Sequence, residues 1–301
     1  SYVTNDELND MTFQRFKLIN RALERIDSTF FAMWVDPDLG CYTDDYIGCD
    51  TLNDLMYVYN QDPLDGTNGC VCNGGVPTYC DRIPILGVDY FRGPRDTFGN
   101  EIGMSSFTYY NNGSVGTHPP GTTDPDLPAE FYNYLTGRWK DGSPFQYGGD
   151  GYQEGTAPTL KYALTDPPDN PAGWSMCTAN LPFGDRRTIQ ASGPFTLKPG
   201  AVNELIIGVP WVPDVGACPD IENLLRADKL AQGLFDNCFE LLDGPDAPTV
   251  NWIELNQEIV AVLTNDVFSN NYKEGYAQVD FLAPDSLKVE DAPWFATPEE
   301  V

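Results

Sequence analysis

Short runs of apolar residues, each about as long as a single β-strand, recur along the first two thirds of the chain. Gly, Pro, Asn and Asp separate them, and those residues favour turns. A strand typically has about 5 to 6 residues, whereas a helix that can be recognised from its pattern needs about 10 or more. The clearest runs lie at residues 85–91, 105–110, 159–164, 188–191 and 204–209. This spacing predicts an all-β domain, and specifically a β-sandwich of the jelly-roll or immunoglobulin-like type.

Two further strands are expected near the start of the chain. Residues 11–20 alternate polar and apolar side chains in part, and residues 28–35 form an aromatic run that ends in an Asp/Pro/Gly turn. We interpret them as two strands joined by a turn near residues 23–27.

One segment, residues 219–239, has the pattern of a helix. Its apolar residues recur at helical spacing, Pro219 stands at its start, and Asp220 and Glu222 fall in its first turn. It is the one helix that the sequence predicts. A turn-rich linker follows, then apolar runs at 250–263 and 277–282 and an acidic tail. We therefore expect a β-sandwich domain with a C-terminal helix over 1–243. Residues 244–301 would then hold a linker, the start of a fibronectin-like or immunoglobulin-like β module, and the tail.

The charge of the chain limits its partners. It has 17 Lys and Arg against 45 Asp and Glu, for a net charge of −28. Nucleic acids and anionic membranes would be repelled, so neither is expected as a partner. No run approaches eighteen apolar residues, and we expect no membrane insertion.

The one histidine, His118, lies in a Pro/Gly-rich stretch that is typical of a loop, which argues against His-dependent catalysis. The chain starts at Ser1, which suggests a processed protein or a piece of a longer one.

Eight cysteines indicate an oxidising compartment and hence an extracellular or cell-surface location. They lack the paired CxxC spacing of a zinc ribbon, so disulfides are the favoured interpretation. Eight cysteines allow 105 pairings. Cys41 and Cys49 bracket an acidic loop and could close it. Cys218 and Cys238 lie at opposite ends of the expected helix, about 30 Å apart, and should not pair. The disulfide candidates are Cys41, Cys49, Cys70, Cys72, Cys80, Cys177, Cys218 and Cys238.

The densest polar group in the sequence is an acidic segment at residues 36–50. Its carboxylates are Asp36, Asp38, Asp44, Asp45 and Asp50. Asp-x-Asp-x-Gly can begin a loop that turns alternate oxygens inward, and Gly40 allows the sharp bend. The segment is not an EF-hand, because Ile47 occupies the position of the twelfth-residue Glu. We predict that these five residues bind a structural Ca²⁺. The alternative is a solvated acidic loop in which the carboxylates cap turns.

Other patterns carry less information. Tyr109, Tyr110 and Trp139 could form a platform on which sugars stack, although buried aromatics are the commoner case. Paired carboxylates for glycoside hydrolysis can be found anywhere in so acidic a chain.

Several strings together resemble a known group of proteins. They are MTF at 11–13, INR at 19–21, WVDPDLG at 34–40, DDYIGCD at 44–50, GRWKDG at 137–142, YGGDGY at 147–152, GDRR at 184–187, SGPFTLKPG at 192–200 and FDNC at 235–238. As a set they are similar to large, mostly uncharacterised secreted or cell-surface proteins of Bacteroidota, over roughly residues 8–265. Such proteins typically leave the cell by type IX secretion.

The resemblance implies an extracellular β-rich module of a multidomain chain, and the group has no assigned catalytic activity that could be transferred to this chain. Bacteroidota attach O-glycans at Asp-Ser/Thr-apolar tripeptides, which makes Ser286 an O-glycosylation candidate. We therefore expect a non-catalytic structural or adhesive module stabilised by calcium and disulfides. The alternatives are a carbohydrate-binding module of a polysaccharide-degrading enzyme and a filament subunit assembled by strand addition. Expected partners are glycans, neighbouring subunits and the following domains of the parent chain.

Overall fold

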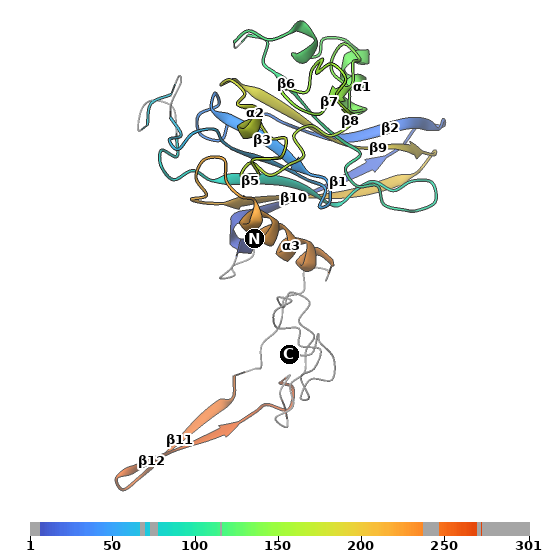
Figure 1. Cartoon of the computed structure of the whole chain (residues 1–301). Coiled ribbons are helices and arrows are strands. Elements are labelled where there is room, and N and C mark those ends of the chain that lie inside the picture. Colours follow the sequence, from blue (N-terminus) through green and yellow to red (C-terminus); the bar gives the residue numbers. More distant parts are fainter. Residues whose placement is uncertain are drawn as a thin grey trace. The chain divides into compact units, whose positions relative to one another are not determined.

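The computed structural model describes residues 7–66, 70–72, 78–114, 116–236, 247–269 and 272. The chain divides into two compact units, residues 1–229 and 230–301. The described part is mainly β, with several antiparallel sheets and few helices (Figure 1). This confirms the β-rich class, while the jelly-roll or immunoglobulin-like type stays a prediction.

The largest sheet has five strands in the order β1-β10-β5-β4-β3, all antiparallel to their neighbours. These strands are β1 (Met11–Ile19), β3 (Asp45–Asp50), β4 (Leu55–Asn60), β5 (Ile85–Arg92) and β10 (Val202–Val212). β4 lies inside the sheet and is buried at every residue. The sheet thus ends in β1 on one side and in β3 on the other.

A second sheet has three antiparallel strands in the order β2-β9-β6. They are β2 (Ile26–Val35), β6 (Ser106–Asn111) and β9 (Arg186–Leu197). A small pair, β7 (Phe145–Gln146) and β8 (Thr159–Leu160), stands apart. The apolar run at 159–164 is therefore strand only at its start.

The two larger sheets contribute to one hydrophobic core and lie one over the other in Figure 1. Tyr90 of β5 shows the contact: its ring packs edge-on against Phe31 of β2, and its hydroxyl donates to the Gln190 carbonyl of β9 at 2.8 Å. Because side chains alternate along a strand, the neighbouring Asp89 points to the opposite face.

The predicted helix is present as α3 (Glu222–Asp236) and begins where the Asp220 carboxylate accepts the Glu222 N–H at 3.1 Å. A β-carbon on Gly87 of β5 would lie 3.3 Å from a Leu224 methyl, so the first half of α3 packs on the sheet. The structure adds helices that the sequence did not predict, α1 (Pro128–Leu135) and α2 (Met176–Ala179). Two 3-10 turns, η1 (Glu7–Asp10) and η2 (Pro120–Thr122), complete the unit.

The two strands expected near the N-terminus are β1 and β2, which confirms that prediction. They do not pair with each other, however. β1 pairs with β10 in the larger sheet, whereas β2 pairs with β9 in the smaller one. The chain therefore crosses from one sheet to the other between Ile19 and Ile26.

The described part of the second unit contains a hairpin of β11 (Thr249–Leu255) and β12 (Glu258–Thr264). Its two-residue turn places Gln257 at a φ of +70°. The run expected at 277–282 lies outside the described residues, and the fibronectin-like or immunoglobulin-like assignment stays a prediction.

Candidate metal centre

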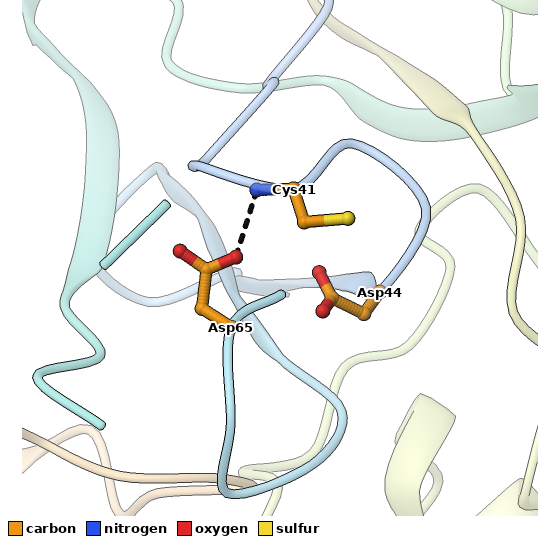
Figure 2. A group of neighbouring side chains, drawn as sticks. All are labelled: Cys41, Asp44 and Asp65. Carbon is orange, nitrogen blue, oxygen red and sulfur yellow. Dashed lines mark hydrogen bonds between the residues drawn. The ribbon is translucent and has the colours of Figure 1, made fainter. Parts of the chain in front are cut away.

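Three side chains at one end of the five-stranded sheet form a compact buried group (Figure 2). The Cys41 sulfur and one carboxylate oxygen each from Asp44 and Asp65 all lie within 4.8 Å of one another. Asp44 and Asp65 are both fully buried. This group of ligand-type atoms could hold a metal ion.

Asp65 connects three separate parts of the chain. Its carboxylate accepts the Cys41 N–H at 2.8 Å and also the Tyr79 N–H, while its own N–H donates to the Cys80 carbonyl at 2.8 Å. A buried carboxylate is costly unless hydrogen bonds or a cation compensate it. The two backbone donors supply part of that compensation and fix the position of Asp65.

Asp44 and the neighbouring Asp45 each keep one unpaired oxygen. Gly66 N–H donates to Asp44 Oδ2 at 3.4 Å, and Leu39 N–H donates to Asp45 Oδ2 at 2.9 Å. The Oδ1 atoms of both residues are buried and have no hydrogen-bond partner in the part of the chain that the structure describes. In Figure 2 the Asp44 carboxylate points toward Cys41 and Asp65. Buried polar atoms normally have a partner, so the unpaired Asp44 oxygen fits an ion held at this place.

Burial and mutual repulsion raise the pKa values of these acids. Burial is the largest cause in raising the pKa of Asp44 to about 7, and the Asp65 charge adds to it. The pKa of Asp45 lies well above its usual value, again mainly because of burial. Without a counter-charge Asp44 and Asp45 therefore stay protonated to higher pH than ordinary carboxyls, and a cation bound at Asp44 would replace its proton.

The buried Arg186 offers limited compensation. Its guanidinium donates to the backbone oxygens of Asp45 and Gly184, both at 3.1 Å, and to that of Pro182. The hydrogen bonds of Arg186 in this structure therefore go to main-chain carbonyls. Burial lowers the pKa of Arg186 accordingly.

Disulfides enclose the group. The structure joins Cys41 to Cys70, Cys72 to Cys80, and Cys177 to Cys218. Six of the eight candidate cysteines are therefore paired, and the expected exclusion of Cys218 from pairing with Cys238 is confirmed. Cys238 itself lies outside the described residues.

The idea that Cys41 pairs with Cys49 is wrong. Cys49 is a free thiol near the C-terminal end of β3, and its sulfur donates to the Ala163 carbonyl at 3.3 Å. It points into the core, because residues along a strand alternate between the two faces.

The Cys41–Cys70 bond also decides the chemistry of the group. A sulfur in a disulfide is not a thiolate, and metal binding by cysteine requires the thiolate. The remaining donors are carboxylate oxygens, which suit hard cations such as Ca²⁺ or Mg²⁺ better than zinc.

The other predicted ligands lie elsewhere. Asp36 forms an ion pair with Arg187 at 3.1 Å, and Asp38 is exposed on the loop. Asp50 is at the far end of β3, about 16 Å from Asp45 at about 3.3 Å per residue. There its carboxylate accepts the N–H groups of Leu52 and Asn53 and closes a turn.

The sequence did not reveal Asp65. It stands outside the acidic segment, and the pairing of β3 with β4 together with the Cys41–Cys70 bond brings it back beside Gly40. Had that disulfide been known, the nearest acid before Cys70 would have been the natural candidate.

The aromatic residues considered for sugar stacking are core residues. Tyr109, Tyr110 and Trp139 are 1%, 4% and 0% exposed, so they form no surface platform. Trp139 stacks on Phe145 with ring centroids 4.0 Å apart.

Comparisons with protein-family models, with curated proteins and with solved structures find no match to this chain. Three disulfides indicate an oxidising environment outside the cytoplasm. No helix in the described ranges is long and apolar enough to cross a membrane.

Proposed function

We propose that this chain is a non-catalytic structural or adhesive module of an extracellular protein, stabilised by its disulfides and by a calcium ion. The observation that carries the proposal is the pair of buried carboxylates, Asp44 and Asp65, held within 4.8 Å in a lobe closed by disulfides. Their positions are fixed by backbone hydrogen bonds, as a preformed structural site requires.

Calcium fits this donor set. It takes six to eight oxygens, and its geometry is flexible enough to combine carboxylates, backbone carbonyls and water. Asp44 and Asp65 would be the first ligands. When bound, the ion would supply positive charge that compensates the buried carboxylates.

Hydrogen exchange tests this proposal. We expect calcium to slow exchange of the Cys41 and Gly66 amides, because they donate to the carboxylates of Asp65 and Asp44. Chelation should speed their exchange, and amides of β2, which belongs to the other sheet, serve as the internal control. Identical exchange with calcium and with chelator would refute the calcium part of the proposal.

Filament assembly by strand addition is the second candidate function. β1 is an edge strand, and its outer side faces no other strand in the described part of the sheet. Arg15 and Lys17 of β1 lie against Glu204 at 2.7 and 3.9 Å, and such charges commonly discourage pairing at an edge. Light scattering across a concentration series tests this alternative, because the average particle mass would rise with concentration if the chains assemble into filaments.

The placement in Bacteroidota, the type IX export route and the following β module belong to the same proposal. So does an O-glycan at Ser286, which lies outside the described residues. Neighbouring subunits and glycans are the proposed partners.

A further inference from the structure

A cleft of about 210 Å³ lies between two turns of the first unit, well apart in sequence from the metal centre. One wall is the turn that joins β9 to β10, with Lys198 at its first position. The other is part of the loop after β5, namely Arg95, Asp96 and Thr97. Asn203 is among the residues that line the cleft.

Hydrogen bonds hold both walls in place. The buried Asn203 side chain accepts the Arg95 N–H at 2.8 Å and donates to the Arg95 carbonyl at 3.1 Å. The Ala201 N–H donates to the Lys198 carbonyl at 2.9 Å, and Gly200 supplies the positive φ of +74° that this turn needs. These hydrogen bonds hold the two walls of the cleft in the absence of a ligand.

The charges in the cleft are unusual for this chain. Acids outnumber bases 45 to 17, and cations such as Arg82 and Arg187 are paired with carboxylates. Arg95 and Lys198 are exposed, and neither side chain has a hydrogen-bond or ion-pair partner among the residues that the structure describes.

The acid in the cleft wall does not neutralise these cations by direct contact. Asp96 is committed to its own loop, where its Oδ1 accepts the N–H groups of Phe98 and Asn100 at 2.8 and 2.9 Å. Two unpaired cations on one small cleft are what a ligand carboxylate requires.

The loop also presents an aromatic ring. Phe98 is 89% exposed, beside Thr97 of the cleft wall. An exposed aromatic ring offers an apolar face against which the C–H face of a sugar ring can pack. The cleft is smaller than typical ligand pockets of roughly 300 to 1,000 Å³, so it suits one sugar residue and not a whole oligosaccharide.

We propose that this cleft binds one carboxylated sugar residue of an otherwise neutral glycan, because the net charge of −28 would repel a polyanion. Arg95 and Lys198 bind the carboxylate, and Phe98 packs against the sugar ring. The site acts independently of the metal centre, and it gives the module a ligand that the buried aromatics Tyr109 and Trp139 cannot bind.

Calorimetric or NMR titration with an acidic trimer, a galactose trimer in which one residue is replaced by galacturonic acid, tests the proposal. We expect binding by the wild type, at least tenfold weaker binding by the double variant Arg95→Gln/Lys198→Gln, and weaker binding by Phe98→Ala. Lys161→Gln is the matched control. It removes an exposed lysine that does not line the cleft, and it should bind like the wild type.

Three further results would overturn the proposal. They are no binding of the acidic trimer, equal binding of the neutral galactose trimer, and equal weakening by Lys161→Gln. Inorganic sulfate is a separate probe for a simple anion site. If sulfate binds as tightly as the trimer and Phe98→Ala changes nothing, the sugar assignment is wrong. The single variant Lys198→Gln gives the same answer should the double variant fold poorly.

Discussion

Gly40 lies directly against the carboxylate of Asp65. A β-carbon on Gly40 would come within 2.0 Å of Asp65 Oδ2, and the φ of Gly40 is +79°, in the left-handed region. Both facts require glycine, one because of space and the other because of backbone conformation. The sequence predicted a bend at Gly40. That bend leaves room for the Asp65 carboxylate, which the sequence did not place beside it.

Replacing Gly40 by alanine should destabilise the fold by about 2 kcal/mol or more, because strain and displacement of Asp65 add together. Gly155→Ala is the matched control. The φ of Gly155 is +67°, but no atom lies within 4 Å of an added β-carbon. This substitution therefore introduces backbone strain without a steric clash. Urea denaturation of both variants measures the difference. Equal losses would show that Asp65 moves aside freely.

Cys49 should not react with a thiol reagent in the folded protein and should react once the chain unfolds without reductant. It is 1% exposed, and burial raises the pKa of its thiol, so little thiolate is available. A colorimetric thiol assay on the wild type and on Cys49→Ala measures this. The variant should release one thiol fewer on unfolding. An unchanged count would mean that Cys49 is in a disulfide.

Strand positions could be predicted where an apolar run meets turn residues on both sides, as at β5 and β6. Pairing could not. The link between β1 and β2 is as short as the turn of a hairpin. The two strands nevertheless belong to different sheets. Local pattern specifies the strand, whereas its neighbour depends on distant residues such as those of β9 and β10.

Helix α1 illustrates another limit. It has only eight residues, and Phe131, Tyr132 and Tyr134 within it favour strands on propensity. Its start is defined by Pro128 and by Glu130, whose carboxylate accepts the Leu127 N–H at 3.1 Å. Such a short helix offers too few turns for a periodic pattern to appear.

The acidic segment was informative in part. It led to Asp44 and Asp45, but sequence proximity placed Asp50 with them. Strand β3 separates its two ends, so residues close in sequence are far apart in space. The Cys41–Cys70 bond has the opposite effect on Asp65, because it helps to bring a residue that is distant in sequence close in space. Both effects come from the fold and not from local composition.

A second pair of buried acids links β5 to α3. Asp89 and Asp228 are 2% and 3% exposed, and their side chains are hydrogen-bonded to each other. Two carboxyls can bond in this way only when they share a proton. Burial first, and then the Asp228 charge, raises the pKa of Asp89 well above its usual value. Asp54, Asp50 and Lys229 are the other charged groups nearby.

This pair predicts that stability falls as pH rises. Burial raises the pKa of Asp228 to about 7 in the folded state, against 3.8 ordinarily. The folded chain thus binds more protons, and the contribution is fully present below about pH 3.8 and is lost as pH rises to about 7. One proton gives a slope of about 1.4 kcal/mol per pH unit.

The variant Asp228→Asn should flatten that slope, because the amide keeps a hydrogen bond to Asp89 without titrating. Asp236→Asn changes an exposed acid of the same helix and should leave the slope unchanged. Denaturation curves between pH 5 and 8, the range that brackets the value of about 7 for Asp228, provide the measurement. A slope that Asp228→Asn does not alter would mean that the two acids share no proton.

The central claim is that Asp44 and Asp65 hold a calcium ion, and the melting temperature with calcium and with chelator tests it most directly. Calcium at about 100 times its Kd would stabilise by about 2.7 kcal/mol, which corresponds to roughly 5 to 10 °C for a unit of this size. Asp44→Asn should abolish the shift, whereas Asp50→Asn, at the other end of β3, should retain it. A wild type that melts at the same temperature in both conditions, or an Asp44→Asn variant that keeps the full shift, would contradict the account.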